Sequence, residues 1–287
     1  MRKVALEQGS QAWLEWRKGL LTATDAAMLM GISPYVTPYK GWQRKVGQAQ
    51  EQAVNSAMLR GQRDEPIARS MFIEQYGINM TPCCIESDTY NFLGASLDGI
   101  SDCGEYLLEI KSQNMDSIKE NGVPGHHMAQ MQHQLLCTDG SAKKCFYVTI
   151  CGNEIHTVEV LPDPKWIEKY VPKAQEFWKG IIFFEAPTMT SKDYKDMSEN
   201  PTWNDYAIEY RKVDEQIKSL ELLKETYKKE LLKICGEDSC LGSGIKVMKK
   251  ISKGRIDYDS VPELSGIDLE KYRKSSTSSW TIMMDRK

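Results

Sequence analysis

Three residues in the stretch GASLDGISDCGEYLLEIKSQ, residues 94–113, have the types and spacing of a metal-dependent catalytic site. Asp98 is followed eleven positions later by Glu109 and thirteen positions later by Lys111. Side chains alternate along a strand, so a strand over 107–111 would place Glu109 and Lys111 on one face. The Ser, Asp and Gly of SDCGEY predict a tight turn before that strand. The resulting hairpin would bring two carboxylates and an ammonium together at one end of a sheet.

Two carboxylates and one backbone carbonyl suit Mg²⁺, which prefers octahedral oxygen ligands and usually keeps several waters. Asp98 and Glu109 would supply the carboxylates, and the strand that presents Glu109 can offer the carbonyl of Ile110. Glu65, in RGQRDEPIAR on the helix before the sheet, could complete this site or bind a second ion. Lys111 would lie near the attacking water and could stabilise charge on a phosphoryl oxygen. Metal, carboxylates and lysine together predict phosphodiester hydrolysis.

A simpler interpretation of the Glu-x-Lys pair is a solvated strand face without chemistry. The context favours a site, because the small residues Gly94, Ala95 and Ser96 precede Asp98 and would let a ligand approach the backbone closely. The pair alone does not decide between these interpretations, and its surroundings favour the catalytic one.

The elements that must hold these residues form an α/β or α+β core, with a central mixed sheet and helices on its faces. Apolar spacing predicts two short helices within 11–31, with Thr22 or Thr24 as an N-cap and Gly31 as a stop. Further helices are expected over 38–47, 53–76, 126–137 and 166–183. Strands are expected near 80–86, 92–97, 106–111, 144–151 and 154–160.

Composition divides the chain into a core over 1–190 and a C-terminal extension over 191–287. In the extension, a long charged helix over 204–235 carries an apolar stripe of Val213, Ile217, Leu220, Tyr227, Leu231 and Ile234. This helix could bind a partner helix, self-associate or pack on its own domain. The tail from 245 onward alternates like a β-hairpin. Its basic stretch Lys246–Arg255 could follow a DNA backbone or protect a strand edge.

The 287-residue chain has the composition of a globular protein, with 41% hydrophobic and 27% charged residues. Its net charge of −3 gives no overall basic character, although a nuclease can concentrate basic residues around one channel. We recognise no signal peptide and no apolar run of membrane length, so we expect a cytoplasmic protein without a membrane partner. The eight cysteines include no CxxC pair, which favours reduced thiols over an iron–sulfur cluster or structural zinc.

Five ordered blocks make the N-terminal half of the chain similar to a known group of nucleases. They span about residues 8–135 and are QGSQAWLEWRKGLLTATDAAMLMGISPY, MLRGQRDEPIAR, ASLDGI, LLEIKS and HMAQMQHQ. Each block is weak alone, but in this order they resemble the PD-(D/E)xK nuclease superfamily. Within it they resemble the YqaJ-like viral recombinase group, which includes phage lambda exonuclease. The resemblance implies a restriction-endonuclease-like core and does not cover the chain after about residue 190.

The resemblance implies roles for the residues of the Asp-Glu-Lys motif. Asp98 and Glu109 match the metal-binding acids of the family, and Lys111 matches its catalytic lysine. Glu65 matches a helix-borne acid that helps to bind the second metal, and Gln130 matches a glutamine that lines the active site. The predicted catalytic set therefore comes from two strands and two helices.

Two positions depart from the family pattern. Leu97 replaces the proline of the superfamily's name, which leaves the acids untouched. Gln134 stands where many relatives have a tyrosine, so this helix face departs from the family pattern.

A pocket for a terminal 5′-phosphate is also implied. Arg17 matches an arginine that reaches this phosphate in exonuclease members, Thr24 stands where the pocket usually has a serine, and Ser96 matches another hydroxyl near it. A helix N-terminus at Thr24 and the bidentate guanidinium of Arg17 would favour an anion there. The simpler interpretations are that Thr24 only caps a helix and that Arg17 only lies on the surface.

His126, His127 and His133 cluster on the predicted helix 126–137. They lack a cysteine or acid partner at zinc-ligand spacing. A helix that faces DNA explains them better than a zinc site.

Taken together, motif and resemblance predict a Mg²⁺-dependent DNA exonuclease of phage or prophage origin, acting 5′→3′ on double-stranded ends during recombination. Two ions are expected, and Mn²⁺ could substitute. The family also implies a single-strand annealing protein as partner and a ring-shaped homotrimer. The alternatives are an endonuclease on the same scaffold and a non-catalytic protein that binds DNA ends.

Overall fold

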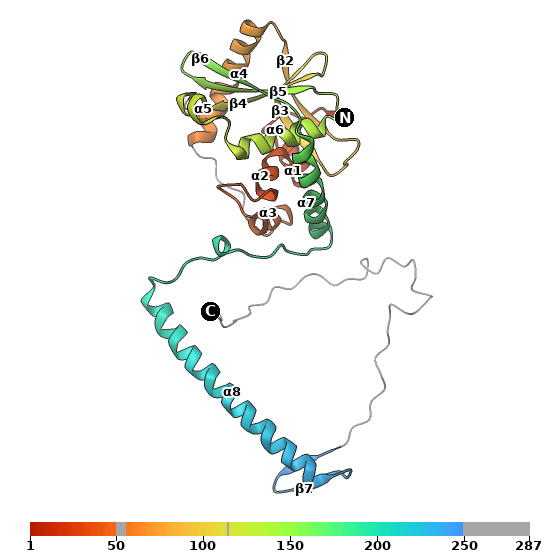
Figure 1. Cartoon of the computed structure of the whole chain (residues 1–287), viewed down its shortest axis with the longest axis vertical. Coiled ribbons are helices and arrows are strands. Elements are labelled where there is room, and N and C mark those ends of the chain that lie inside the picture. The colour runs from red at the N-terminus through yellow and green to blue at the C-terminus, as the bar shows by residue number, and fades with distance from the viewer. Residues whose placement is uncertain (50–55, 114, 249–287) are drawn as a thin grey trace, which may run out of the picture. The chain divides into compact units, whose positions relative to one another are not determined.

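The structure, a computed structural model, describes residues 1–49, 56–113 and 115–248. The chain divides into two compact units, Met1–Lys195 and Asp196–Lys287. The first unit holds a six-stranded sheet with helices around it, and the described part of the second holds a long helix and a two-stranded hairpin (Figure 1).

The sheet of the first unit has the strand order β1-β2-β3-β4-β5-β6. Its strands are β1 (Arg2–Val4), β2 (Met80–Glu86), β3 (Gly94–Ser101), β4 (Tyr106–Ser112), β5 (Lys144–Cys151) and β6 (Glu154–Val160). Strands β4 and β5 pair in parallel, and the other neighbours pair antiparallel. The predicted mixed sheet and its five predicted strands are confirmed, and the short edge strand β1 is an addition to the prediction.

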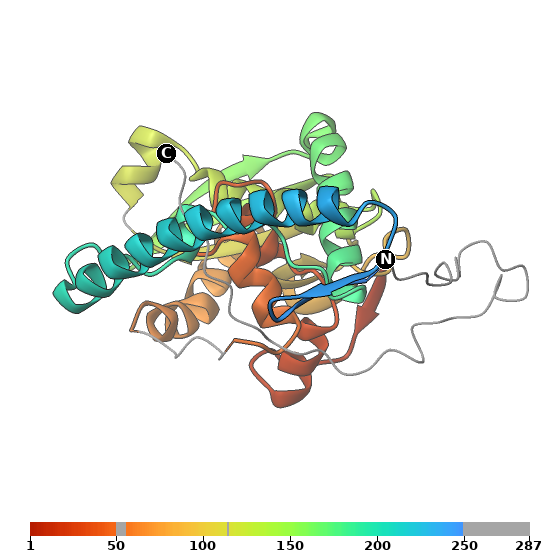
Figure 2. The ribbon, with the colours of Figure 1, turned by 90° about the horizontal axis from the view of Figure 1, so that it is seen from below.

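Helices cover both faces of this sheet (Figure 1 and, from below, Figure 2). They are α1 (Gln11–Lys18), α2 (Ala23–Leu29), α3 (Pro38–Lys45), α4 (Ser56–Tyr76), α5 (Met115–Asn121), α6 (Gly125–Cys137) and α7 (Pro164–Ile182). The predicted helices are confirmed, except that the start expected at 53 lies outside the described residues and α5 was not foreseen. No helix in the described ranges is long and apolar enough to cross a membrane.

The alternation predicted for β4 decides which face receives the motif. Leu108 and Ile110 pack with Phe72 of α4 in one buried cluster. Leu107 belongs to the other cluster, which joins the opposite face of the sheet to α2, α6 and α7. Glu109 therefore points away from α4 and toward α6, as the period of two along a strand requires.

Local sequence signals set the helix ends near the N-terminus. Thr22 is the N-cap of α2, and Thr24 lies inside its first turn. Thr37 caps α3, and its side chain accepts a hydrogen bond from the N–H of Lys40 at 3.2 Å. Gly31, just beyond the end of α2, has a φ of +74°, which a residue without a Cβ adopts at little cost.

The second unit begins its regular structure with α8 (Pro201–Cys235). The side chain of Asn200 caps this helix by accepting a hydrogen bond from the N–H of Trp203 at 3.0 Å. A hairpin of β7 (Cys240–Gly242) and β8 (Ile245–Val247) follows. The predicted helix 204–235 is confirmed. The hairpin of β7 and β8 was not foreseen, and the hairpin predicted from 245 onward lies mostly outside the described residues. Most of the basic stretch 246–255 lies outside the described residues.

Candidate active site

The hairpin of β3 and β4 brings the Asp-Glu-Lys motif together. Beyond the paired residues Gly99 and Leu108, the Asp98 carboxylate accepts the N–H of Ile110 at 2.7 Å. The ammonium of Lys111 forms an ion pair with Glu109. The side chain of Asp98 thus takes the place of a backbone acceptor, and this contact fixes its carboxylate beside β4.

Helix α4 adds a third carboxylate through an arginine. Arg69 donates from Nε to the carbonyl of Asp98 at 2.7 Å and forms an ion pair with Glu65, one helical turn earlier. The guanidinium therefore ties α4 to β3 and holds Glu65 near the motif. Arg69 is absent from the sequence prediction, although its spacing of four residues from Glu65 is a recognisable signal for a helical ion pair.

Two amide side chains of α6 complete the surroundings of Glu109. Gln130 donates to Oε1 of Glu109 and Gln134 donates to Oε2, each at 2.6 Å. Glu109 is only 1% exposed, so its carboxylate has lost contact with water. The two amides replace the hydrogen bonds that water would have made. The prediction for Gln130 placed it at this site, where it lies. Gln134, which departs from the family pattern, is an equal partner of the same carboxylate.

We call Glu65, Asp98, Glu109 and Lys111 the carboxylate cluster. Burial raises the pKa of Asp98 well above its ordinary value, and the nearby charge of Glu109 adds to this. The pKa of Glu65 is also raised, mainly by burial, although Arg69 opposes the change. Burial alone would lower the pKa of Lys111, but Glu109 and Asp98 outweigh it and raise that pKa. The cluster therefore concentrates negative charge around one firmly protonated lysine.

The donor set can be compared with the needs of a metal ion. Within the described residues, no group of three or more His, Cys, Asp or Glu side chains is arranged to hold one. The oxygens of Glu109 both accept hydrogen bonds from α6, and Ile110 contributes its N–H to Asp98. The chemistry of the donors fits a hard divalent cation, because Glu65, Asp98 and Glu109 offer oxygen atoms only. Metal ligation by these residues and by the Ile110 carbonyl stays a prediction.

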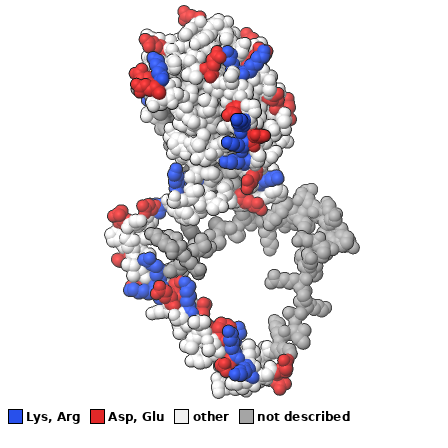
Figure 3. Space-filling model, in the orientation of Figure 1, with Lys and Arg blue, Asp and Glu red and all other residues white. Residues whose placement is uncertain are grey.

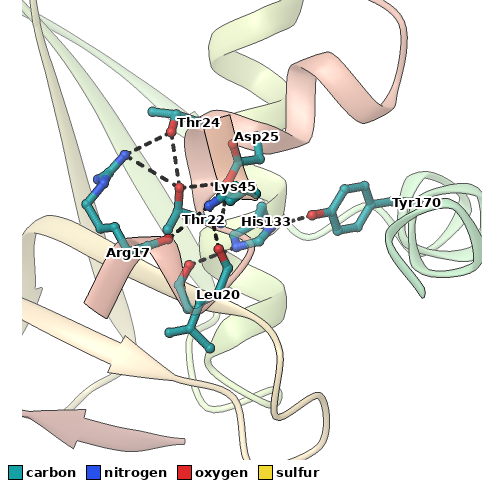
Figure 4. A network of polar contacts seen from close by, with 9 residues as sticks. Arg17, Leu20, Thr22, Thr24, Asp25, Lys45, His133 and Tyr170 are labelled. Atoms are coloured by element: carbon teal, nitrogen blue, oxygen red, sulfur yellow. Dashed lines mark hydrogen bonds and ion pairs between the residues drawn. The ribbon is translucent and has the colours of Figure 1, made fainter. Parts of the chain in front are cut away.

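A second polar site is centred on Arg17, at the end of α1 (Figure 4). Its guanidinium donates to the hydroxyl of Thr24 at 3.0 Å and to that of Thr22 at 3.5 Å, and it lies 4.5 Å from the centre of the Trp13 ring. Trp13 in turn donates to the hydroxyl of Ser96 at 2.7 Å. We call these five residues the arginine pocket. Arg17 and Thr24 are in direct contact, whereas Ser96 joins them through the indole.

The charge of Arg17 has no counter-ion in this pocket. Burial lowers the pKa of Arg17, which is the response of a cation that loses water. In the part of the chain that the structure describes, Arg17 forms hydrogen bonds with hydroxyls and no ion pair with a carboxylate. The nearby charge of Asp25 opposes the lowering of this pKa, but among the described residues Arg17 remains a partly buried cation without an ion pair, which favours the binding of an anion from outside.

Lys45 of α3 links the elements around the arginine pocket. Its Nζ donates to the carbonyl of Arg17 at 2.9 Å, to the carbonyl of Leu20 at 2.5 Å and to the Asp25 carboxylate at 2.9 Å (Figure 4). Asp25 also accepts the N–H of Thr22 at 2.8 Å. Burial would raise the pKa of Asp25, but Lys45, the N–H of Thr22 and the charge of Arg17 together outweigh it, and the pKa is lowered. No sequence motif indicates this lysine, because two of its three acceptors are backbone carbonyls.

The histidines of α6 do not form one group. His133 is fully buried, with Nδ1 2.7 Å from the Tyr170 hydroxyl and Nε2 3.0 Å from the Gly94 carbonyl. Nδ1 of His127 lies 2.7 Å from the Tyr147 hydroxyl, and His126 packs edge-on against the ring of Tyr35. The prediction that these histidines face DNA is wrong for His133, because its position on α6 turns it into the core.

Solved structures share this fold. An alkaline exonuclease from Laribacter hongkongensis, LHK-Exo, superposes with a TM-score of 0.54 alone and 0.55 in its complex with dAMP. Both comparisons have 24% sequence identity and cover 61% of this chain and 94% of that one. The fold of the first unit is therefore that of a known exonuclease.

The sequence itself is similar to a known family. Residues 12–141 match the YqaJ-like viral recombinase domain, and every residue of the two sites described above lies within this range. The uncharacterized protein YqaJ of Bacillus subtilis (strain 168) is 25% identical over 232 residues, which cover 76% of this chain and 73% of that protein. Residues 12–141 are thus similar to the YqaJ-like viral recombinase domain, and the predicted resemblance is confirmed.

Proposed function

We propose that this chain is a metal-dependent deoxyribonuclease that degrades double-stranded DNA from 5′-phosphorylated ends, in the 5′→3′ direction, during homologous recombination. The observation that carries the proposal is the convergence of Asp98, Glu109 and Lys111 in a YqaJ-like domain, with Glu65 tied to them by Arg69. LHK-Exo, which shares the fold and has been solved with dAMP, supports an exonuclease.

Glu65, Asp98, Glu109 and the Ile110 carbonyl would hold one or two Mg²⁺ or Mn²⁺ ions. Such an ion polarises the scissile phosphate and lowers the pKa of the attacking water. Lys111, raised in pKa and anchored by Glu109, keeps a positive charge where a phosphoryl oxygen gains negative charge. Water attacks the phosphorus, the bond to the 3′-oxygen of the leaving nucleotide breaks, and that oxygen takes a proton. Gln130 and Gln134 keep Glu109 in place throughout.

The arginine pocket supports a preference for ends. A 5′-phosphate offers the anion that Arg17 lacks, and the hydroxyl of Thr24 can donate to the same group. An enzyme that recognises this phosphate has its cutting position fixed one nucleotide from the end. The family resemblance extends the proposal to a single-strand annealing protein as partner and to a ring-shaped trimer.

The first experiment compares linear duplex DNA with 5′-phosphate ends and closed circular DNA, in Mg²⁺ and in EDTA. We expect loss of the linear substrate alone, only in Mg²⁺, with release of mononucleotides. Lys111→Met should abolish it. Lys144→Met is the matched control, since Lys144 lies on the adjacent strand β5 and pairs with Glu159 away from the cluster. Nicking of the circle would instead assign an endonuclease, and binding of ends without cleavage in Mg²⁺ or Mn²⁺ would assign a non-catalytic protein.

A further inference from the structure

Helix α8 carries an apolar seam that runs almost its whole length. Apolar residues recur at alternating steps of three and four, and we call this set the α8 seam: Trp203, Tyr206, Tyr210, Val213, Ile217, Leu220, Tyr227, Leu231 and Ile234. Lys224 occupies the one remaining position of the series. A repeat of this kind is the a/d pattern of a coiled coil, with Trp203 at the first a position. The seam starts three steps earlier than the predicted stripe at Val213.

The seam is exposed in the part of the second unit that the structure describes. None of the residues of α8 is buried, and the exposed fractions include 64% for Leu220 and 80% for Ile234. At 1.5 Å per residue the helix is about 50 Å long, so the seam far exceeds an ordinary scatter of apolar residues on a surface. Most helical stability in proteins comes from packing of such a face, and a facing helix is therefore the expected occupant.

The charges of the residues beside the seam indicate which kind of helix can bind it. In a coiled coil the e and g positions flank the seam and set partner choice. Here they hold four acids and one base, Lys228, and the acids are Glu209, Asp214, Glu221 and Glu230. Charged side chains follow the helix in Figure 3. Most of its bases, however, fall at the outer b, c and f positions.

A second copy of this chain fits these flanks poorly. In a parallel pair, Glu209 would face Asp214 of the other helix, and none of the flanking positions would pair opposite charges. In a fully overlapping antiparallel pair, Glu209 would face Glu230 and Asp214 would face Glu221. Both arrangements therefore place like charges together, which is destabilising.

Two of the four acids have partners on their own helix. Glu209 pairs with Lys212 at 2.7 Å and Asp214 pairs with Lys218 at 2.5 Å. Glu209, Glu221 and Glu230 are exposed, and Asp214 is partly exposed. Ion pairs at exposed sites contribute little to stability, so a base on an approaching helix can replace Lys212 or Lys218. Among the described residues, Glu221 and Glu230 form no ion pair, and they remain open to a base from outside.

We propose that the α8 seam binds a helix of a different protein, one that carries an apolar heptad seam flanked by Lys or Arg. This surface lies outside residues 12–141, the part that matches the YqaJ-like domain. The interaction is independent of the nuclease activity proposed above.

The test uses the full chain and two synthetic helical peptides as long as α8. Both peptides have the same Ile and Leu seam, and they differ only in carrying Lys or Glu at the flanking positions. We expect the Lys peptide to bind about tenfold more tightly at low salt, because about four flanking pairs each contribute a fraction of 1 kcal/mol. High salt should reduce this difference.

Two matched variants locate the binding surface. Leu220→Asp, in the seam, should abolish binding of the Lys peptide. Leu222→Asp, on the outer face of the same turn and 73% exposed, should leave binding unchanged. Circular dichroism of both variants confirms that the helix is retained.

Three results would overturn the proposal. Equal binding of the two peptides would show that the flanks do not select a basic partner. Absence of binding to either would show that the seam takes no such helix. Sedimentation of the chain alone as an oligomer that Leu220→Asp disperses, and Leu222→Asp does not, would assign the seam to a second copy.

Discussion

The carboxylate cluster and the arginine pocket differ in whether their charged side chains form ion pairs. In the cluster, the charges face one another: Lys111 pairs with Glu109, and Arg69 pairs with Glu65. In the pocket, the cation of Arg17 contacts hydroxyls and an aromatic ring, and it forms no ion pair with any of the residues that the structure describes. Our proposed function gives this difference a meaning, since a catalytic centre needs fixed charges and a binding pocket needs a charge left for its ligand.

The largest expected effect is that of Asp98→Asn. The substitution keeps the shape and an acceptor for the Ile110 N–H but removes one negative charge. We expect activity on linear DNA to fall about 1000-fold, as when a site loses one main electrostatic group. The midpoint of urea unfolding should stay the same or rise, because repulsion with Glu109 is relieved. Retained activity would exclude Asp98 from catalysis, and a lower midpoint would contradict the picture of repulsion.

Arg17→Ala should act on binding rather than on chemistry. Loss of the guanidinium removes a charge-assisted contact, so KM for 5′-phosphorylated ends should rise about 10- to 100-fold with little change in kcat. Ends with a 5′-hydroxyl should be degraded as by the unchanged protein. Arg44→Ala, an exposed arginine on α3, is the control. An equal loss on both kinds of end would mean that Arg17 does not recognise the phosphate.

Lys45→Met should loosen the arginine pocket without touching a ligand. The substitution leaves Asp25 and two carbonyls without their donor, and we expect a loss of about 2 kcal/mol in the free energy of unfolding. KM for phosphorylated ends should rise only several-fold. Combining it with Asp25→Asn should recover part of the stability, because the unpaired carboxylate is then gone. Urea titration of the two single variants and the double variant measures this coupling.

The smallest expected effect is a difference in how Asp98 of the cluster and the buried His133 respond to acid. Burial lowers the pKa of His133 to about 4, so its contribution to stability is present above the unfolded value near 6.5 and is lost as pH falls toward 4. The raised pKa of Asp98 acts in the opposite direction, because its protonation in acid favours the folded state. In EDTA, Asp98→Asn should therefore lose stability more steeply between pH 6.5 and 4 than the unchanged chain. Parallel slopes would mean that Asp98 does not titrate differently on folding.

The sequence predicted the parts of the fold and site that depend on local spacing. The hairpin that joins Asp98 to Glu109 follows from alternation and a turn within fourteen residues, 98–111. Lys45 and the contact of Arg69 with β3 were missed because these interactions join elements distant in the chain, and several of the acceptors are backbone carbonyls that leave no mark in the sequence. His133 was misplaced for a related reason, since only the packing of α6 decides which of its faces is buried.

The secondary structure divides in the same manner. Long strands with alternating or fully apolar residues, such as β5 and β6, were predicted with nearly the bounds that they have. Strand β1 has only three residues, and α5 has seven with few buried apolar side chains, so neither produces a strong period. Their places are set by neighbours, β2 for the former and the crossover before α6 for the latter.

The parallel pairing of β4 with β5 has a consequence for how the protein folds. Parallel neighbours need a long crossover, and here residues 113–143, which include α6, supply it. The hairpin of β3 and β4 can form early from local contacts. Gln130 and Gln134 reach Glu109 only after the crossover has closed, and this closure costs conformational entropy before the new contacts stabilise the chain. We therefore expect the two strands of the motif to meet first and the burial of Glu109 to be among the slower events of folding.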